Sequence, residues 1–156
     1  MLEIDIPGFG LVKLKHLVSD FTGTLSVDGR LLPGVRGQLG EIAKFLMIHI
    51  LTADTFGKAR EELNGIDCEM HILSGAEHDV QKEEYAKKLG ADSVVAFGNG
   101  NNDRKMLKAA RIGIAVSQGE GCAVDAITSA DIHVTGANIG LDLLLHSKRI
   151  KATLRF

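Results

Sequence analysis

The sequence predicts an α/β fold in which a mostly parallel, six-stranded sheet carries helices on both faces. Short runs rich in β-branched and aliphatic residues alternate six times with segments of helical periodicity. These runs are apolar along almost their whole length, as expected of strands that a parallel sheet buries on both faces. The expected strands span residues 16–20, 48–53, 69–74, 93–100, 111–117 and 130–135.

Two hairpins are expected in addition to this sheet. The segments LEIDI and LVKL alternate in hydrophobicity and flank the turn-forming sequence PGFG, which predicts an N-terminal β-hairpin at an edge of the fold. The sequence SVDGRLLP contains Asp28 and Gly29, a pair favoured in two-residue hairpin turns. It predicts a small flap hairpin before the first helix.

Helices are expected between the strands. In residues 33–47, apolar residues recur at spacings of four, three and four from Val35 to Leu46, which places them on one face of a helix. The closing sequence SKRIKATLRF is interpreted as a solvated helix end. The other expected helices span residues 55–65, 79–90, 101–110 and 121–129, and a last one begins near Asn138.

Composition limits the classes of function. The 156 residues suit one domain, 1–156, and a net charge of −2 lacks the basic excess of a nucleic-acid-binding protein. No apolar run approaches the roughly 20 residues that span a bilayer, and the N-terminus lacks the pattern of a signal peptide. We therefore expect a cytoplasmic protein without a nucleic-acid or membrane partner. Cys68 and Cys122 form no CxxC pattern, and the six histidines show no metal-binding spacing.

Polar residues follow directly after three of the predicted strands. Asp20 ends the first buried strand, Thr52 lies at the end of the second, and the group Asn99, Asn102 and Asp103 follows the apolar part of the strand expected over residues 93–100. Ligands of open parallel sheets bind at the carboxyl ends of the strands. We therefore expect these side chains to meet at one edge of the sheet.

The same residues resemble the motifs of the haloacid dehalogenase (HAD) superfamily of phosphohydrolases. HLVSDFTGTL is similar to its first motif, an apolar strand followed by Asp-x-Asp-Gly-Thr-Leu, and HILTAD to its second. Lys82 is similar to the third motif, and VVAFGNGNNDRKML to the fourth, Gly-Asp-Gly-x-Asn-Asp. The resemblance covers residues 16–135 and implies a HAD-like (Rossmannoid) sheet.

The resemblance implies a role for each residue, and the chemistry of phosphoryl transfer fits those roles. Asp20 would be the nucleophile that forms an aspartyl-phosphate, and Thr22 takes the position of the catalytic acid and base. A Mg²⁺ ion would be held by Asp20, the backbone carbonyl of Thr22 and Asp103, and Asn99 would either bind the ion as well or orient a water beside it. The phosphate would be bound by Thr52 and Lys82, which also count as catalytic, and by the backbone at Gly23 and Ala53.

Each side chain also has an ordinary structural interpretation. Asp20 can cap a turn, and Thr52 can simply end a strand. Lys82 lies in QKEEYAKK, which is typical of a solvated helix face, and Asp103 can start the following helix.

Two positions depart from the HAD pattern. Thr22 stands where the superfamily has its general acid and base, so DFTGTL is closer to the DKTGTL of P-type ATPases, and TAD resembles their TGD. Only 27 residues separate Thr24 from Thr52, which leaves no room for the nucleotide-binding domain of such a pump. The chain therefore resembles soluble P-type ATPase-like HAD proteins that consist of the phosphorylation domain. Asn99 stands where Asp is usual and removes a charge from the metal site.

The sequence thus favours a Mg²⁺-dependent phosphatase or ATPase-like phosphohydrolase acting on a phosphorylated small molecule or a phosphoprotein. Neither usual insertion point has room for a cap domain, so a second subunit of a homo-oligomer or a large substrate would have to close the site. The alternative is a phosphate-sensing or scaffolding module with little turnover, which Thr22 and Asn99 favour.

Overall fold

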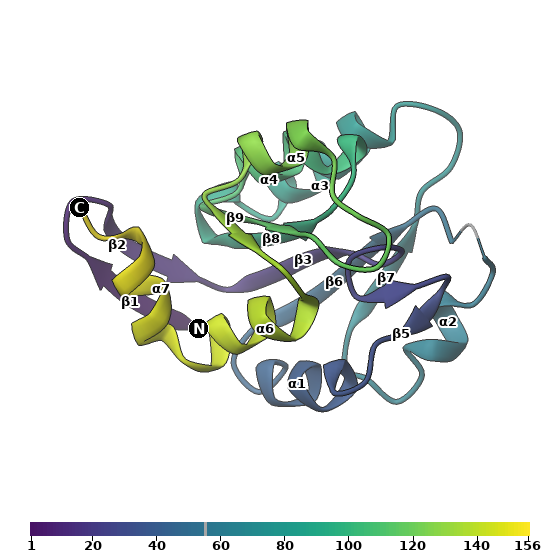
Figure 1. Cartoon of the computed structure of the whole chain (residues 1–156), viewed down its shortest axis with the longest axis horizontal. Coiled ribbons are helices and arrows are strands. Elements are labelled where there is room, and N and C mark those ends of the chain that lie inside the picture. The colour runs from purple at the N-terminus through teal and green to yellow at the C-terminus, as the bar shows by residue number, and fades with distance from the viewer. Residues whose placement is uncertain (55) are drawn as a thin grey trace.

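The computed structural model describes residues 1–54 and 56–156, and its centre is a six-stranded sheet (Figure 1). Its strands are β3 (His16–Asp20), β6 (Met47–Thr52), β7 (Glu69–Ile72), β8 (Val94–Gly98), β9 (Ile112–Val116) and β10 (Ile132–Val134). They lie in the order β10-β9-β8-β3-β6-β7, and every neighbouring pair is parallel. The predicted α/β class and parallel sheet are confirmed.

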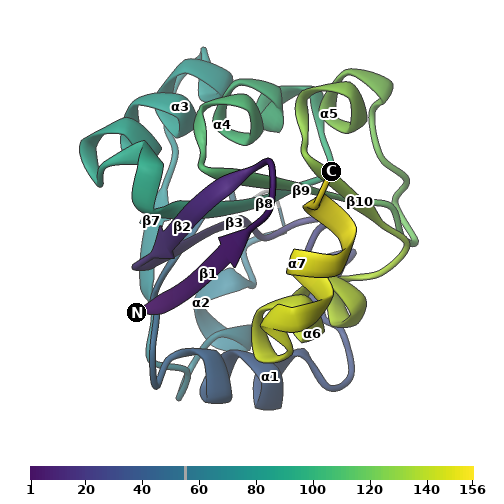
Figure 2. The same ribbon diagram turned by 90° about the vertical axis from the view of Figure 1, so that its left-hand side faces the viewer.

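Helices cover both faces of the sheet, as predicted. Figures 1 and 2 show α3, α4 and α5 on one face, and α1 and α6 on the other. The helices are α1 (Val35–Ile42), α2 (Ala59–Glu62), α3 (His78–Lys88), α4 (Arg104–Ala109), α5 (Val124–Ser129), α6 (Ala137–Leu145) and α7 (Ser147–Leu154), with short 3₁₀ turns η1 (Ala91–Ser93) and η2 (Asn101–Asp103). None of the helices in the described part of the chain combines the length and the apolar character needed to span a bilayer.

Each face of the sheet has its own apolar core. Along β8, Val95 and Phe97 pack into the core under α1 and α6, while Val94 and Ala96 pack into the core under α3 and α4. This alternation follows from the period of two in a β-strand. Because β3 lies between β6 and β8 and all five of its residues are buried, its C-terminal residue is held on a well-packed strand.

The N-terminal hairpin is confirmed, but it does not extend the large sheet. Strands β1 (Leu2–Ile6) and β2 (Gly10–Leu14) pair only with each other in the described structure, with Leu2 opposite Leu14. Helix α7 packs against β1 and buries Ile150 completely. The closing sequence is therefore a separate helix that covers the hairpin (Figure 2), not the solvated end of α6.

The flap is short and tied to its surroundings. Strands β4 (Ser26–Val27) and β5 (Arg30–Leu31) form the predicted hairpin, and they are the only strands between β3 and α1. The N–H of Asp28 donates to Glu120 Oε2 at 3.1 Å, and the N–H of Leu31 donates to Glu62 Oε2 at 2.8 Å. The segment that could hold a cap thus contains only this flap.

Several helices are shorter than predicted, for local reasons. Helix α1 ends at Ile42, whose carbonyl accepts the N–H groups of Phe45 and Leu46, and so turns the chain into β6. Helix α2 begins at Ala59, because its N–H donates to Asp54 Oδ1 at 2.9 Å. The predicted helix 55–65 begins at a residue that lies outside the described part of the chain. The helix predicted over 101–110 divides into η2 and α4.

A buried pair of histidines joins β3 to β6. His16 Nδ1 lies 3.0 Å from His49 Nε2, while His49 Nδ1 lies 3.0 Å from the Tyr85 hydroxyl and 3.4 Å from Glu69 Oε2. Only one of the two facing nitrogens can carry a proton, because two N–H groups would point at each other. Burial lowers the pKa of both His16 and His49 below the usual value of 6.5.

We expect this pair to make the protein less stable in weak acid. The unfolded chain binds protons near pH 6.5, whereas the folded pair binds them only at lower pH, so the free energy of unfolding falls as pH decreases through this range. Urea unfolding at about pH 7.5 and about pH 5.5 should show a smaller fall for His49→Gln than for the wild type. The exposed His133→Gln is the control, and an equal fall in all three proteins would contradict this assignment.

Candidate active site

The predicted strand-end residues lie at one edge of the sheet. Asp20 is the last residue of β3 and pairs in register with Leu51 of β6, so Thr52 is one residue further along the neighbouring strand. On the other side of β3, β8 ends at Gly98, directly before Asn99. The parallel directions of these strands therefore bring Asp20, Thr52 and the segment after Gly98 to the same edge of the sheet.

A buried lysine joins two carboxylates at this edge. Lys82 Nζ donates to Asp20 Oδ1 at 2.9 Å and to Asp103 Oδ1 at 2.6 Å. Lys82 is 1% exposed, Asp103 is fully buried and Asp20 is 7% exposed. Lys82 therefore does not belong to a solvated helix face, which was the alternative that its sequence context left open.

Burial and neighbouring charges shift the pKa values of two members of this cluster, Asp20 and Lys82. Burial, with the neighbouring Asp103 carboxylate, raises the pKa of Asp20 to about 6, although Lys82 and the Thr24 hydroxyl oppose the rise. Burial pulls the pKa of Lys82 down, but the two carboxylates outweigh it and raise that pKa above its usual value. Lys82 consequently stays charged and balances one of the two negative charges.

Asp103 is fixed by the turn that leads into α4. Its Oδ2 accepts the N–H groups of Asn99 at 3.0 Å and Gly100 at 2.9 Å, which folds the chain back between β8 and η2. Its Oδ1 is thereby directed toward Lys82. Asp103 thus both shapes the start of the helix and contributes to the charge cluster.

Thr24 is a member of the cluster that the sequence motifs did not single out as a site residue. Its buried hydroxyl lies 3.1 Å from both Asp20 Oδ2 and Asn99 Oδ1, so it links the two carbonyl-type oxygens. Asn99 Nδ2 donates to the carbonyl of Gly121 at 3.1 Å and fixes the orientation of the amide. Gly23 has a φ of +80°, and a Cβ there would lie 2.5 Å from Asn99 Nδ2, so only glycine fits beside the amide.

The other predicted residues surround this cluster without an observed hydrogen bond to it in the described residues. The hydroxyl of Thr52 accepts the N–H of Asp54 at 2.9 Å and so shapes the loop after β6, in which Ala53 is exposed. Thr22 is half-buried in the loop after Asp20 and is bridged to Ser26. Asn102 is exposed on η2.

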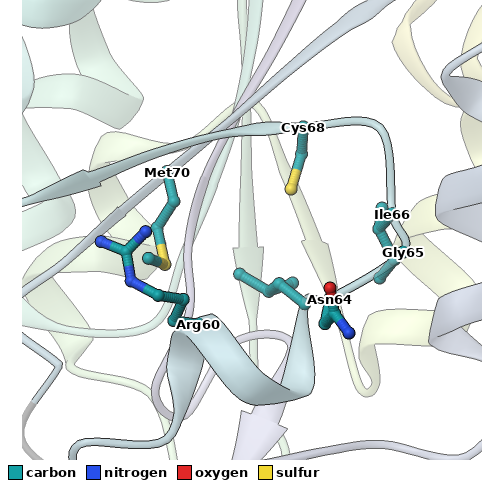
Figure 3. A pocket seen from close by; sticks show the side chains of 7 residues that line it. Arg60, Asn64, Gly65, Ile66, Cys68 and Met70 are labelled. Atoms are coloured by element: carbon teal, nitrogen blue, oxygen red, sulfur yellow. The ribbon is translucent and has the colours of Figure 1, made fainter.

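A separate cavity lies away from this cluster, between α2 and β7 (Figure 3). Its volume is about 260 Å³, and it contains none of the predicted site residues. Burial, with Asp67 next to it in the chain, raises the pKa of the Cys68 thiol. The cavity is lined by Arg60, Leu63, Asn64, Gly65, Ile66, Cys68 and Met70.

The cluster combines oxygen atoms that could bind a metal ion with one positively charged side chain, that of Lys82. Within residues 1–54 and 56–156, no three His, Cys, Asp or Glu side chains gather as a metal site, and the two carboxylates that Lys82 joins are those of Asp20 and Asp103. The amide oxygen of Asn99 lies close to them through Thr24. Such a set suits a hard divalent cation better than zinc or copper.

Comparison with known proteins agrees with these features. The family model of haloacid dehalogenase-like hydrolases matches residues 76–138. An uncharacterized protein of Methanocaldococcus jannaschii is 47% identical over 73 residues, which are 47% of this chain and 78% of that protein. A probable copper-exporting P-type ATPase of Archaeoglobus fulgidus is 31% identical over 106 residues, which are 67% of this chain but 13% of the ATPase.

A solved structure shares the fold over nearly the whole chain. It is the 3-deoxy-D-manno-octulosonate 8-phosphate phosphatase of Moraxella catarrhalis in complex with a magnesium ion, a phosphate ion and the sugar. The two structures superpose with a TM-score of 0.60 at 21% sequence identity, over 91% of this chain and 94% of the phosphatase. With the motifs, the fold and these relatives in agreement, the chain belongs to the haloacid dehalogenase-like hydrolases.

Proposed function

We propose that residues 1–156 form a single catalytic domain that hydrolyses phosphate esters or anhydrides through an aspartyl-phosphate on Asp20. The observation that carries this proposal is the buried Lys82, held between Asp20 and Asp103 at the carboxyl edge of the sheet. Burying a lysine that is 1% exposed together with two carboxylates carries a large desolvation cost. Arrangements of this kind occur where charge has to be positioned for chemistry.

Asp20 is the nucleophile in this proposal. One of its carboxylate oxygens forms a bond to phosphorus while the bond to the leaving-group oxygen breaks, and water then cleaves the aspartyl-phosphate to release inorganic phosphate. Lys82 is close enough to Asp20 Oδ1 to balance the negative charge of the incoming phosphoryl group. The hydroxyl of Thr24 orients the other oxygen, Oδ2.

The oxygen donors at this edge fit Mg²⁺. Asp20, the backbone carbonyl of Thr22, Asp103 and the amide oxygen of Asn99 would hold it, and all four supply the hard oxygen ligands that Mg²⁺ takes. The magnesium and phosphate ions bound to the Moraxella phosphatase support this choice. When bound, the ion would neutralise charge on the phosphoryl group and hold it in line with the nucleophile.

The substrate is a phosphorylated small molecule or a phosphoprotein. Thr52, Lys82 and the backbone N–H groups at Gly23 and Ala53 would bind the phosphate oxygens. The short flap is tied to Glu120 and Glu62, and therefore leaves the rest of the substrate uncovered. A second copy of the chain in a homo-oligomer, or the bulk of a large substrate, would cover it.

The test is steady-state release of inorganic phosphate with Mg²⁺ from p-nitrophenyl phosphate, ATP and a panel of phosphate esters. Release that depends on both the protein and Mg²⁺ is expected. Asn99 and Thr22, which replace the usual carboxylates, favour a second function, phosphate sensing or scaffolding without turnover. Binding of phosphate without release from any ester would support that alternative.

Asn99→Asp should strengthen Mg²⁺ binding and lower the free energy of unfolding of the metal-free protein. A third carboxylate should lower the Mg²⁺ concentration for half-maximal activity about tenfold, which corresponds to about 1.4 kcal/mol. Without Mg²⁺, the new carboxylate would face the Gly121 carbonyl that now accepts a hydrogen bond, at a cost of about 1–3 kcal/mol. Asn102→Asp adds the same charge at an exposed neighbouring position and is the control. Equal shifts in both Mg²⁺ titrations would show that Asn99 is not a ligand.

A further inference from the structure

The loop between β9 and α5, residues 117–123, contacts the candidate active site, although it contains none of the residues that the motifs indicated. The N–H of Ala123 donates to the carbonyl of Asn99 at 2.7 Å, and the carbonyl of Gly121 accepts Asn99 Nδ2 at 3.1 Å. The N–H of Gly121 donates to the carbonyl of Gln118 at 2.7 Å, which closes a tight turn within the loop. The loop is therefore fixed against Asn99, and Gln118 has a defined place beside the site.

The side chain of Gln118 reaches from this loop to the turn that follows Asp20. Its Nε2 donates to the carbonyl of Thr24 at 2.7 Å and, at a longer distance of 3.3 Å, to the carbonyl of Ser26. Thr24 is fully buried, and in the described part of the chain no other group donates to its carbonyl. A buried carbonyl that loses its donor has no water to replace it. Gln118 therefore holds the backbone of Thr24 in place.

The Thr24 hydroxyl connects this backbone contact to the proposed nucleophile. It lies 3.1 Å from Asp20 Oδ2, while Lys82 Nζ lies 2.9 Å from Asp20 Oδ1, so each carboxylate oxygen faces a donor. The torsion that rotates a carboxylate is broad, so these two donors, rather than the side chain itself, set its orientation. Threonine is stiff at χ1, so its hydroxyl moves together with its backbone. A shift of the Thr24 backbone would therefore release one of the two groups that orient Asp20.

The same loop also holds the flap, but through a different residue. Glu120 Oε2 accepts the N–H of Asp28 at the tip of the flap at 3.1 Å. Among the described residues, the Glu120 side chain has no hydrogen bond to the turn that follows Asp20. A purely structural role of the loop would depend on both Glu120 and Gln118, whereas a role in orienting Asp20 would depend on Gln118. Glu120 is therefore the matched control.

We propose that Gln118 is a positioning residue of this site, which holds Thr24 so that its hydroxyl keeps the Asp20 carboxylate in the orientation for attack on phosphorus. The inference rests on the proposed function. In this role Gln118 touches neither the substrate nor the reacting atoms and acts through Thr24. Attack requires the nucleophilic oxygen within about 3–3.5 Å of phosphorus and in line with the leaving group, and a misplacement of about 1 Å can cost about 10²-fold in rate.

The experiment measures kcat and KM for p-nitrophenyl phosphate with Mg²⁺ in Gln118→Met and Gln118→Asn. Methionine has a similar length but no donor, and asparagine keeps the amide on a side chain too short to reach Thr24. Both variants should lower kcat about 10–10²-fold and change KM less than about threefold, because the lost contact orients the nucleophile rather than binding the substrate. Glu120→Met should keep kcat within about twofold of the wild type. An equal loss of kcat in Glu120→Met, or a change confined to KM, would overturn the proposal.

A double-mutant cycle tests whether Gln118 acts through the Thr24 hydroxyl. Thr24→Val removes the hydroxyl and keeps the shape of the side chain. If the hydroxyl carries the effect, adding Gln118→Met to the Thr24→Val protein should lower kcat less than about twofold further. Full additivity of the two losses would mean that Gln118 affects the site by another route, and the proposal would then be wrong.

Crystal structures of the same variants test the contact without turnover. In Gln118→Met the Asp20 carboxylate should turn away from its 3.1 Å contact with the Thr24 hydroxyl, and in Glu120→Met this contact should remain. If the wild type hydrolyses no phosphate ester at all, the proposed function fails and this inference with it. An active wild type with an unmoved Asp20 carboxylate in Gln118→Met would refute this inference alone.

Discussion

Asp20→Asn is expected to reduce Mg²⁺-dependent phosphate release by more than about 10³-fold, because an amide cannot form the aspartyl-phosphate. Intact mass after incubation with acetyl phosphate should show a phosphoryl adduct on the wild type and none on the variant. Asp5→Asn changes an exposed aspartate on the N-terminal hairpin and should retain both activity and adduct.

The fold should tolerate this change, because the surrounding donors can adapt to an amide. The oxygen of the new side chain can still accept from Lys82, which now lies 2.9 Å from Asp20 Oδ1. The new NH₂ group would face Thr24, whose hydroxyl can turn and donate to Asn99 Oδ1 at 3.1 Å. A variant that retains wild-type turnover would place the nucleophile elsewhere in the chain.

The position of the site could be predicted from the sequence because it follows from strand order and direction. Asp20 ends an apolar run, and Asp103 follows another one; in a parallel sheet such strand ends share an edge. Lys82 could not be placed by its surroundings, because QKEEYAKK reads as a solvated helix face. Only the HAD motif indicated it, and the structure shows a buried ion pair.

The role of Thr24 depends on geometry that no local pattern carries. Thr24 reaches Asp20 and Asn99 only because the loop after β3 turns back and its N–H groups bond to the carbonyl of Phe21.

The sequence also did not predict that α7 is a helix separate from α6. The chain from Asn138 onward reads as one amphipathic helix, but it breaks at His146, where φ is −129° and ψ is 67°. The apolar residues of α6 pack on the large sheet, whereas Ile150 packs into the core beneath the N-terminal hairpin. Two different partners thus require two helix directions, which periodicity alone does not reveal.

Lys82→Met is expected to destabilise the protein by about 3–5 kcal/mol near neutral pH and to abolish turnover. Methionine fills a similar volume but leaves Asp20 and Asp103 buried without a positive charge, and an uncompensated buried charge carries a cost of this size. Lys87→Met is the matched control on the same helix. Lys87 is exposed, and its one ion pair among the described residues is with Glu83, at 2.6 Å, so its loss should cost less than about 1 kcal/mol.

The pH dependence of the free energy of unfolding of Lys82→Met should show why this variant loses stability. Lys82 lowers the pKa of Asp20, so its removal should raise that pKa further above its present value of about 6. A carboxyl whose pKa is higher in the folded state than in the unfolded chain adds stability as pH falls from the folded pKa toward the unfolded pKa near 3.8. Urea unfolding should therefore show that the variant recovers part of its stability between about pH 7.5 and about pH 5.5 relative to Lys87→Met. A loss that is independent of pH would mean that Lys82 stabilises the fold by packing its alkyl chain rather than by its charge.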